Sequence, residues 1–224
     1  MAETSGSGGG PQTDEPKARS PLGWLVVLLV AAGLLAVTTL GVLYAMRLGP
    51  FQQQVEATAG QSALSRYATG SIASLNTPAE PEPIIAYTFQ DRAGEPVDFS
   101  AFQGQITVVN LWAMWCAPCR IEMPTLAALQ RHYDPAVLKV VAINVDTGED
   151  AISNARSFLD VNEPLEFYSD PTFRLPFELP GGQLMPQTYV LDRQGRIVAW
   201  KAGEADWSSP EARALFDALI ADGS

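Results

Sequence analysis

Cys116 and Cys119 are the only thiols in the 224 residues of the chain, and two residues separate them. A pair at this spacing can close a small ring by oxidation and reopen it by thiol–disulfide exchange. The pair directly follows the apolar run 106–112 and a tryptophan-containing turn. A thiolate at the start of a helix is activated for attack. The spacing therefore predicts a redox-active dithiol.

Two structural roles for the cysteines compete with redox chemistry. A structural zinc site usually takes four thiolate or imidazole ligands, whereas the chain offers two cysteines and one histidine, His132. His132 falls near the end of the helix predicted below, where a solvated side chain is typical. A structural disulfide would close a very short loop and constrain little of the unfolded chain. We therefore expect no metal site and no cofactor other than a redox-active Cys116–Cys119 disulfide.

An uncharged run over residues 22–46 is long enough to cross a membrane. At about 1.5 Å per residue, a helix of this length spans a hydrocarbon core of about 30 Å with some tilt. A cleavable signal has a shorter apolar region of about 7 to 15 residues, and no Ala-x-Ala site follows this run. A buried core helix is the other alternative, but the run is apolar on every face. Residues 21–46 are therefore predicted to be a transmembrane signal-anchor helix.

The charges around this run predict its orientation. Lys17 and Arg19 precede it, whereas Arg47 alone follows closely, so the N-terminus is expected in the cytoplasm. Residues 1–20, rich in Gly, Ser and Pro, are predicted to be a disordered cytoplasmic tail. The dithiol then works outside, where disulfides persist. A net charge of −11, nearly all of it after the span, argues against nucleic acid as a partner.

The exported part divides into a linker and a domain. Residues 47–83 are rich in Gln, Ala, Ser and Thr and end in a proline-rich stretch, so they are predicted to be a stalk with a marginal helix between residues 52 and 74. Residues 84–224 alternate strand and helix patterns, which is typical of an α/β fold.

The predicted elements of this domain follow from apolar runs and turn residues. Residues 106–112 suit a central strand buried on both faces, which should return in parallel, through the helix after it, to the strand 137–145. Pro118 suits a first helical turn, and Pro124 should kink the helix. The predicted strands are 84–89, 106–112, 137–145, 165–168, 188–191 and 197–200, and the predicted helices are 116–133, 149–161 and 209–221.

The position of each cysteine predicts its role. Cys116, at the helix N-terminus, is the expected attacking thiolate, because unpaired amides and the helix dipole favour a negative sulfur there. Cys119 lies one turn inside and should resolve the mixed disulfide. Ala117 and Pro118 separate them and alter the local amide geometry.

Other candidate residues flank the dithiol. Trp115 is adjacent to the first thiol and is the expected surface contact for a substrate, whereas Trp112 could equally pack the core. Glu122 lies three residues after Cys119, on a neighbouring helical face. On sequence alone, a carboxylate there complements the helix dipole.

The order of these motifs resembles the thioredoxin superfamily. The strings NLWAMWCAPCRIEMPTLAALQ, VVAINVD, LMPQTYVLDRQGRI and AGEADWSSPEARALFDALI are most similar to the TlpA, ResA and CcmG group of membrane-anchored bacterial thiol:disulfide interchange proteins. The resemblance covers roughly residues 84–221. It implies a thioredoxin-like fold with a central mixed sheet flanked by helices. It also implies a single-pass protein of the bacterial inner membrane with its domain in the periplasm.

The resemblance assigns further residues. It makes Pro186 a cis-proline facing the cysteines, although an X-Pro bond is usually trans. Met185 would offer its backbone to a bound substrate strand. Glu122 would handle protons for the thiols, since a nearby carboxylate raises thiol pKa values and can relay a proton. Thioredoxin carries an aspartate where this chain has Asn110, which gives Glu122 more weight.

Three functions remain open. The first is a reductase of disulfides in exported proteins, recycled by a membrane electron donor of the DsbD or CcdA type. The second is an oxidase with the same motif at a higher potential. The third is a copper metallochaperone, which is disfavoured because Sco-type factors use a wider cysteine spacing and a distant histidine.

The resemblance also suggests the client of a reductase. Similarity to TlpA implies a copper-assembly factor or a copper-site subunit of cytochrome c oxidase. Similarity to ResA and CcmG implies apocytochrome c. CcmG-like proteins usually carry Glu after the cis-proline, so Gln187 favours the TlpA-like client.

Overall fold

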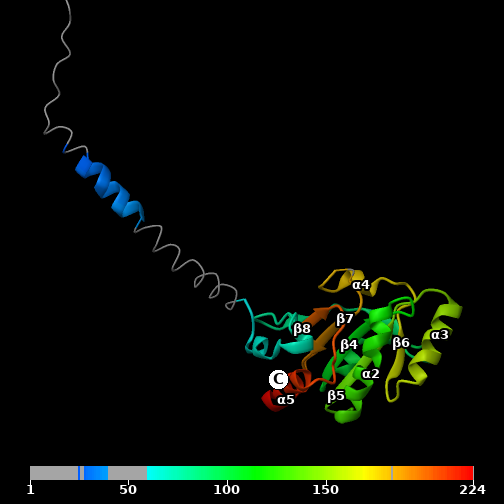
Figure 1. The fold of residues 1–224 in the computed structure, drawn as a ribbon. Helices are drawn as coiled ribbons and strands as arrows, with labels where there is room; N and C mark the ends of the chain where they lie inside the picture. Colours follow the sequence, from blue (N-terminus) through cyan, green and yellow to red (C-terminus); the bar gives the residue numbers. More distant parts are fainter. Residues whose placement is uncertain (1–24, 26–27, 40–59, 183, 224) are drawn as a thin grey trace, which may run out of the picture. The chain divides into compact units, whose positions relative to one another are not determined.

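The computed structural model describes residues 25, 28–39, 60–182 and 184–223, and the chain divides into two compact units between residues 55 and 56 (Figure 1). In the first unit, residues 28–39 are helical, and apolar side chains such as Leu29 and Leu35 are exposed. None of the described helices has both the length and the apolarity needed to cross a membrane. The predicted tail 1–20, and the predicted span apart from residues 25 and 28–39, lie outside the described residues.

The second unit contains a mixed sheet of eight strands in the order β1-β8-β7-β4-β5-β6-β2-β3. The strands are β1 (Glu82–Pro83), β2 (Thr88–Gln90), β3 (Pro96–Asp98), β4 (Ile106–Trp112), β5 (Leu138–Asn144), β6 (Glu166–Ser169), β7 (Gln187–Leu191) and β8 (Arg196–Ala202). The described α-helices of this unit are α2 (Ala117–His132), α3 (Glu149–Asp160), α4 (Leu175–Glu178) and α5 (Pro210–Asp222). Three short 3₁₀ helices are η1 (Ala63–Tyr67), η2 (Gly70–Ile72) and η3 (Phe99–Phe102).

Strand β4 is the centre of the sheet, and every one of its residues is buried. It pairs in parallel with β5, with Val108 opposite Val140, and antiparallel with β7. Because β-branched side chains fit a strand buried on both faces, the run 106–112 forms the predicted central strand. The predicted parallel return through α2 to β5 is confirmed. Pro118 lies in the first turn of α2, as predicted, and Pro124 lies inside the helix.

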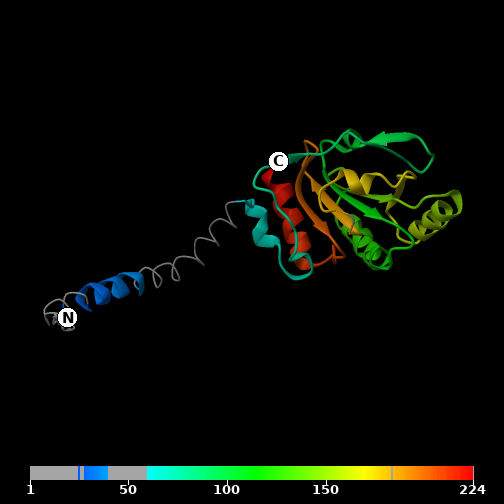
Figure 2. The same cartoon turned by 90° about the horizontal axis from the view of Figure 1, so that it is seen from above.

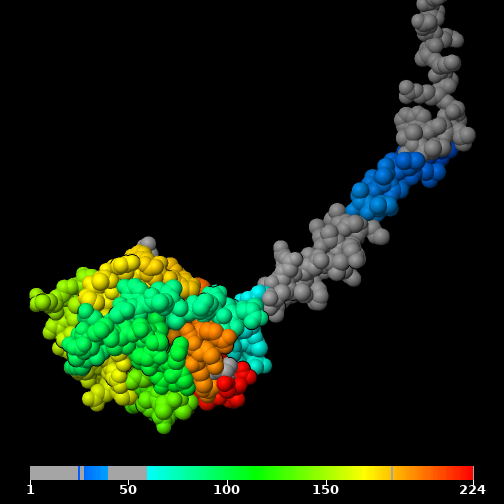
Figure 3. Space-filling model, turned by 180° about the vertical axis from the view of Figure 1, so that it is seen from behind, coloured from blue at the N-terminus to red at the C-terminus, as the bar shows by residue number. Residues whose placement is uncertain are grey.

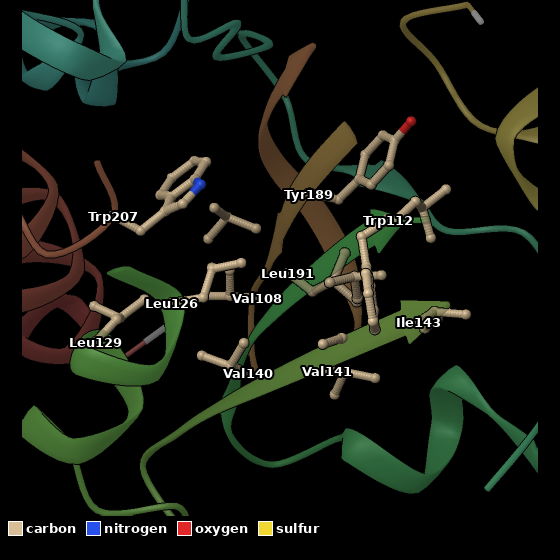
Figure 4. Packing of buried hydrophobic residues seen from close by; sticks show 14 of the residues in the cluster. Val108, Trp112, Leu126, Leu129, Val140, Val141, Ile143, Tyr189, Leu191 and Trp207 are labelled. Carbon is tan, nitrogen blue, oxygen red and sulfur yellow. The ribbon is translucent and has the colours of Figure 1, made fainter. Parts of the chain in front are cut away.

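The core joins α2 to the sheet. Leu126 and Leu129 of α2 are fully buried, and Figure 4 shows them on the same side as Val108 and Val140, with Trp207 beside them. Burying each such side chain contributes about 1.5 to 3 kcal/mol relative to exposure. This packing fixes α2 against β4 and β5. Cys116 lies in the turn between β4 and α2, and Cys119 lies in the first turn of the helix.

The N-terminal segment (residues 60–83) is part of the domain, which corrects the predicted linker over these residues. Asn76 exchanges two backbone hydrogen bonds with Trp200 of β8. Ile72 and Leu75 are buried in the core. Figures 2 and 3 show the segment against β8 and α5. The segment is mostly polar, so its sequence gave no sign that these two apolar side chains are buried. They lie in a segment that packs against β8 and α5. The rest of the predicted linker, residues 47–59, lies outside the described residues.

Replacing Ile72 with alanine tests whether this segment stabilises the domain. Ile72 is fully buried, so we expect the free energy of unfolding to fall by about 2 to 4 kcal/mol. Urea denaturation followed by tryptophan fluorescence measures the change. Val161, which is exposed, provides the control, and Val161→Ala should leave the midpoint nearly unchanged. Equal midpoints for the two variants would mean that the segment is the loose linker first predicted.

The remaining differences concern short elements. The predicted strand 84–89 is wrong in its bounds: β1 ends before it, at one edge of the sheet, and β2 overlaps only its last two residues and lies between β6 and β3. Strand β3 and helix α4 were not predicted, because elements of three or four residues carry almost no periodicity. The hairpin of β7 and β8, with a glycine at its turn, and the final helix α5 follow the prediction to within a few residues.

Candidate functional site

Cys116 and Cys119 form a disulfide at the start of α2, with their Cα atoms 5.3 Å apart. Cys116 is the N-cap residue of the helix, and its Sγ accepts a hydrogen bond of 3.2 Å from the Cys119 N–H. An acceptor at an N-cap satisfies an amide that has no partner within the helix. Both cysteines are buried, but Ala117 and Pro118 between them are exposed. The Cys116 sulfur therefore lies where amides and the helix dipole stabilise a thiolate.

A buried aspartate holds the turn that carries the first cysteine. The Asp146 carboxylate accepts hydrogen bonds of 2.8 Å from the Met114 N–H and from the Asn144 side chain. The Arg120 guanidinium donates to the Met114 carbonyl from the other side. These contacts fix the backbone between β4 and α2. Asp146 was not among the residues predicted from sequence, although an acid directly after an apolar strand is a signal for such a role.

Glu122 is a buried carboxylic acid one helical turn after Cys119, with only 1% of its surface exposed. Its Oε1 accepts from Asn110 Nδ2 at 2.6 Å, and its Oε2 accepts from the Ala205 N–H at 3.1 Å. Burial raises its pKa from 4.5 to about 7, although these hydrogen bonds and the nearby Trp207 and Lys201 lower it. The Trp207 indole N–H, which forms no hydrogen bond within the described residues, lowers the pKa less than the bonds from Ala205 and Asn110 do. From sequence alone, Glu122 was interpreted as a carboxylate that complements the helix dipole, and its burial was not predicted.

A row of polar side chains crosses the sheet beneath Glu122. Asn110 of β4 lies opposite Thr188 of β7, and Thr188 lies opposite Lys201 of β8. Directly opposed residues in antiparallel strands project to the same face. The Asn110 Nδ2 also donates to Thr188 Oγ1 at 2.9 Å. Thr188 and Lys201 were not singled out from sequence, although a lysine in the otherwise apolar run IVAWKA breaks the expected pattern.

Pro186 follows a cis peptide bond from Met185 and is buried, and Met185 is half-buried. The Pro186 carbonyl accepts a hydrogen bond of 2.8 Å from the Gly203 N–H. The next residue, Gln187, begins β7 and lies opposite Leu111 of β4. Because β4 leads directly into the cysteine turn, the register places the Met185–Pro186 bond at the same end of the sheet as the disulfide.

Aromatic side chains extend the exposed surface beside the cysteines. Trp115 is 60% exposed, and its ring meets the edge of Phe173 at 6.0 Å between centroids. Phe173 in turn contacts the exposed Phe177 of α4, at 5.4 Å. Phe173 has a φ of 54°, a left-handed conformation that an aromatic residue rarely adopts. The Asp170 carboxylate stabilises this turn by accepting from the backbone N–H groups of residues 172, 174 and 175.

The other predicted residues lie away from the disulfide or in the core. Trp112 is fully buried and contacts Phe158 of α3, so it packs the core. His132 is exposed at the end of α2 and meets the Tyr133 ring edge-on. Within the described ranges, no three His, Cys, Asp or Glu side chains converge as a metal site would require.

Comparisons with known proteins identify the family. The AhpC/TSA family matches residues 82–200. Thiol-disulfide oxidoreductase ResA of Bacillus subtilis is 25% identical over 50% of this chain and 61% of its own length. Thioredoxin-like protein YneN of the same organism is 32% identical over 50% of this chain and 64% of its own length. The chain thus spans less than two thirds of each of these relatives.

A solved structure supports the same relationship. The secreted thiol-disulfide isomerase from Corynebacterium glutamicum is 28% identical and covers 62% of this chain and 83% of its own, with a TM-score of 0.51. The predicted thioredoxin-like fold, with its mixed sheet and flanking helices, is confirmed. The chain belongs to the AhpC/TSA family, within which it is similar to thiol-disulfide oxidoreductases of the ResA type.

Proposed function

We propose that this protein is an exported thiol:disulfide oxidoreductase that reduces disulfides in other exported proteins. The observation that carries the proposal is the buried Glu122 behind a disulfide whose first sulfur caps a helix. A helix N-terminus lowers thiol pKa values and stabilises the reduced form. A carboxylate nearby opposes this, because it disfavours a second negative charge and so favours the disulfide. A dithiol that favours its own oxidation is a reductant.

The reaction is a two-step exchange in the reduced protein. The Cys116 thiolate attacks one sulfur of a client disulfide, forming a mixed disulfide and releasing the other client sulfur as a thiolate, which takes up a proton. Cys119 then loses its proton and attacks Cys116 Sγ, which releases the second client thiol and leaves the Cys116–Cys119 disulfide. Glu122 accepts the Cys119 proton, since both groups are buried on α2 one turn apart.

Two features at the disulfide end of the sheet are assigned to client binding. The Trp115 ring, with Ala117 and Pro118, forms the surface over the reactive sulfur. The backbone of Met185, before the cis-proline Pro186, pairs with an extended client segment. Both roles rest on the position of these residues at the disulfide end of the sheet and on the resemblance to thioredoxins.

The uncharged run predicts an anchor, and the resemblance to the TlpA, ResA and CcmG group implies the location and the donor. The uncharged run 22–46 anchors the protein in the bacterial inner membrane, with the domain in the periplasm. A membrane electron donor of the DsbD or CcdA type returns two electrons to the Cys116–Cys119 disulfide after each turnover. The preferred client is a copper-assembly factor or the copper-site subunit of cytochrome c oxidase. The second candidate is apocytochrome c, which the resemblance to ResA and CcmG implies.

Equilibration with glutathione tests the direction of electron flow. We expect a reduction potential nearer to the value of thioredoxin, about −270 mV, than to that of a strong oxidase, about −120 mV. The Glu122→Gln variant serves as the internal comparison, since loss of the carboxylate should raise the potential. A wild-type value close to −120 mV would show that the protein forms disulfides instead.

A further inference from the structure

Lys201 is a buried lysine with no assigned role. Only 6% of its surface is exposed, and within the described residues no carboxylate lies within salt-bridge distance of it. Its Nζ donates to Ser74 Oγ at 2.7 Å and to the Ala202 carbonyl at 3.5 Å. Removing an ammonium group from water is costly, so a buried lysine without a close counter-ion needs an explanation.

The strand register places Lys201 in line with the acid of the active site. Asn110, Thr188 and Lys201 are direct neighbours across β4, β7 and β8, and Asn110 donates to both Thr188 and Glu122. Two strand spacings amount to roughly 10 Å, so the lysine backbone lies at about that distance from Asn110. Between two buried groups, charge acts over such a distance with little screening by solvent.

We infer that Lys201 is a positioning residue for the dithiol, whose charge, held in place by Ser74, stabilises the ionised carboxylate of Glu122. The inference rests on the proposed function, because Glu122 is the proton acceptor in that reaction. Lys201 opposes the effect of burial on the pKa of Glu122, in agreement with this geometry. The lysine keeps the carboxylate ionised often enough near neutral pH to accept the Cys119 proton.

Among the acids near Lys201, Glu122 is the one whose ionised form the lysine charge stabilises most. Glu204 and Asp206, in the loop after β8, are exposed to solvent. Glu211 of α5 accepts a hydrogen bond from the Ser71 N–H. Thr188 of β7 and Ser74 of the N-terminal segment are neutral. Exposed carboxylates are screened by water, whereas Glu122 is buried as deeply as the lysine.

The N-terminal segment supplies the hydroxyl that fixes the lysine. Ser74 lies before the range matched by the family, and its segment is held to β8 by the Asn76–Trp200 pair and to α5 by the Ser71–Glu211 contact. Ser71 Oγ also donates to the Asp206 carbonyl. The segment therefore links the edge of β8 and the side of α5 to the electrostatics of the active site.

The test measures the titration of Glu122 in the oxidised, full-length protein. The ¹³C chemical shift of the Glu122 carboxyl is followed against pH, and the midpoint of its titration is recorded. The signal is assigned as the one that is missing from the spectrum of Glu122→Gln. In Lys201→Met, which keeps the apolar stem without the charge, we expect the midpoint to rise by about one pH unit. In Lys201→Arg, which keeps the charge, the midpoint should stay near that of the wild type.

Ser74→Ala provides a second test if Lys201→Met does not fold. Ser74 is exposed, so its replacement should not disturb folding, but it removes the hydroxyl that holds the lysine. We expect a smaller upward shift of the same midpoint. An unchanged midpoint in Lys201→Met, or in Ser74→Ala when the methionine variant is unfolded, would overturn the inference. An equal rise in Lys201→Arg and Lys201→Met would do so as well. The oxidised protein needs no turnover for this measurement, so the result is separate from the failure of reductase activity.

Discussion

Replacing Cys119 with serine is expected to trap the protein as a mixed disulfide with its client through Cys116. The Cys116 thiolate can still attack, because its position at the N-terminus of α2 does not depend on the second sulfur. Without Cys119, no internal thiol attacks the mixed disulfide, so the adduct persists. Turnover of a model disulfide substrate should fall to the rate of the uncatalysed exchange.

The matched control is Cys116→Ser. A hydroxyl does not replace a thiolate as a nucleophile toward sulfur, so this variant should form no adduct and show no turnover. Non-reducing electrophoresis and mass spectrometry of the adducts from cells of the parent organism identify the trapped client. A copper-assembly factor or oxidase subunit supports the preferred client, and apocytochrome c supports the second. Adducts in the Cys116→Ser variant but none in Cys119→Ser would reverse the assigned roles.

The reactive pair and its supporting helix could be predicted because their signals are local. The apolar run before Cys116, the first-turn Pro118 and the spacing to Cys119 lie within 14 residues of sequence. The structure places a disulfide at the N-cap of α2, where the prediction put the nucleophile. Such a signal does not depend on long-range packing.

The environment of Glu122 could not be predicted from the same stretch. Asn110 in β4 lies only 12 residues before it, but the Ala205 amide after β8 and the side chain of Trp207 are distant in sequence. Helical spacing showed only that the carboxylate follows Cys119 by one turn. The proton role is what the resemblance to ResA-type proteins implies, and the burial of the carboxyl group supports proposing it.

The prediction that the domain begins at residue 84 was wrong for a related reason. Residues 60–83 carry few apolar side chains, and their composition is typical of a linker. Ile72 and Leu75 are buried in a segment that lies against β8 and α5, which are far from it in sequence. A short segment that adds to a completed sheet edge has no periodicity of its own to reveal it.

Glu122→Gln is expected to slow disulfide exchange while stabilising the oxidised protein at high pH. Loss of the proton acceptor should lower the rate of the second step by about 10²-fold, the lower end of the range for general acid–base catalysis. The rate should also lose its dependence on pH near 7, where the acid titrates. Stopped-flow measurement of mixed-disulfide decay between pH 5 and 9 checks both expectations.

The effect on stability has a defined sign. The pKa of Glu122 is about 7 in the folded protein against an ordinary 4.5, so between these values the folded state holds a proton that the unfolded state has released. Stability therefore falls as pH rises through this window, and the ionised acid costs about 3 kcal/mol above pH 7. Glutamine removes this dependence. It also forfeits one of the two hydrogen bonds to the carboxylate, so the net gain at pH 8 should be smaller.

The comparison is made by urea denaturation of the oxidised proteins at pH 5 and pH 8. The stability of Glu122→Gln relative to the wild type should increase from the lower to the higher pH, whereas Glu204→Gln, at an exposed acid, should show no such change. A relative stability independent of pH would mean that Glu122 titrates normally in the folded protein. For Glu122→Gln we expect a lower rate of exchange but a higher stability at pH 8. If the carboxylate served structure and not chemistry, its replacement would lower the stability as well.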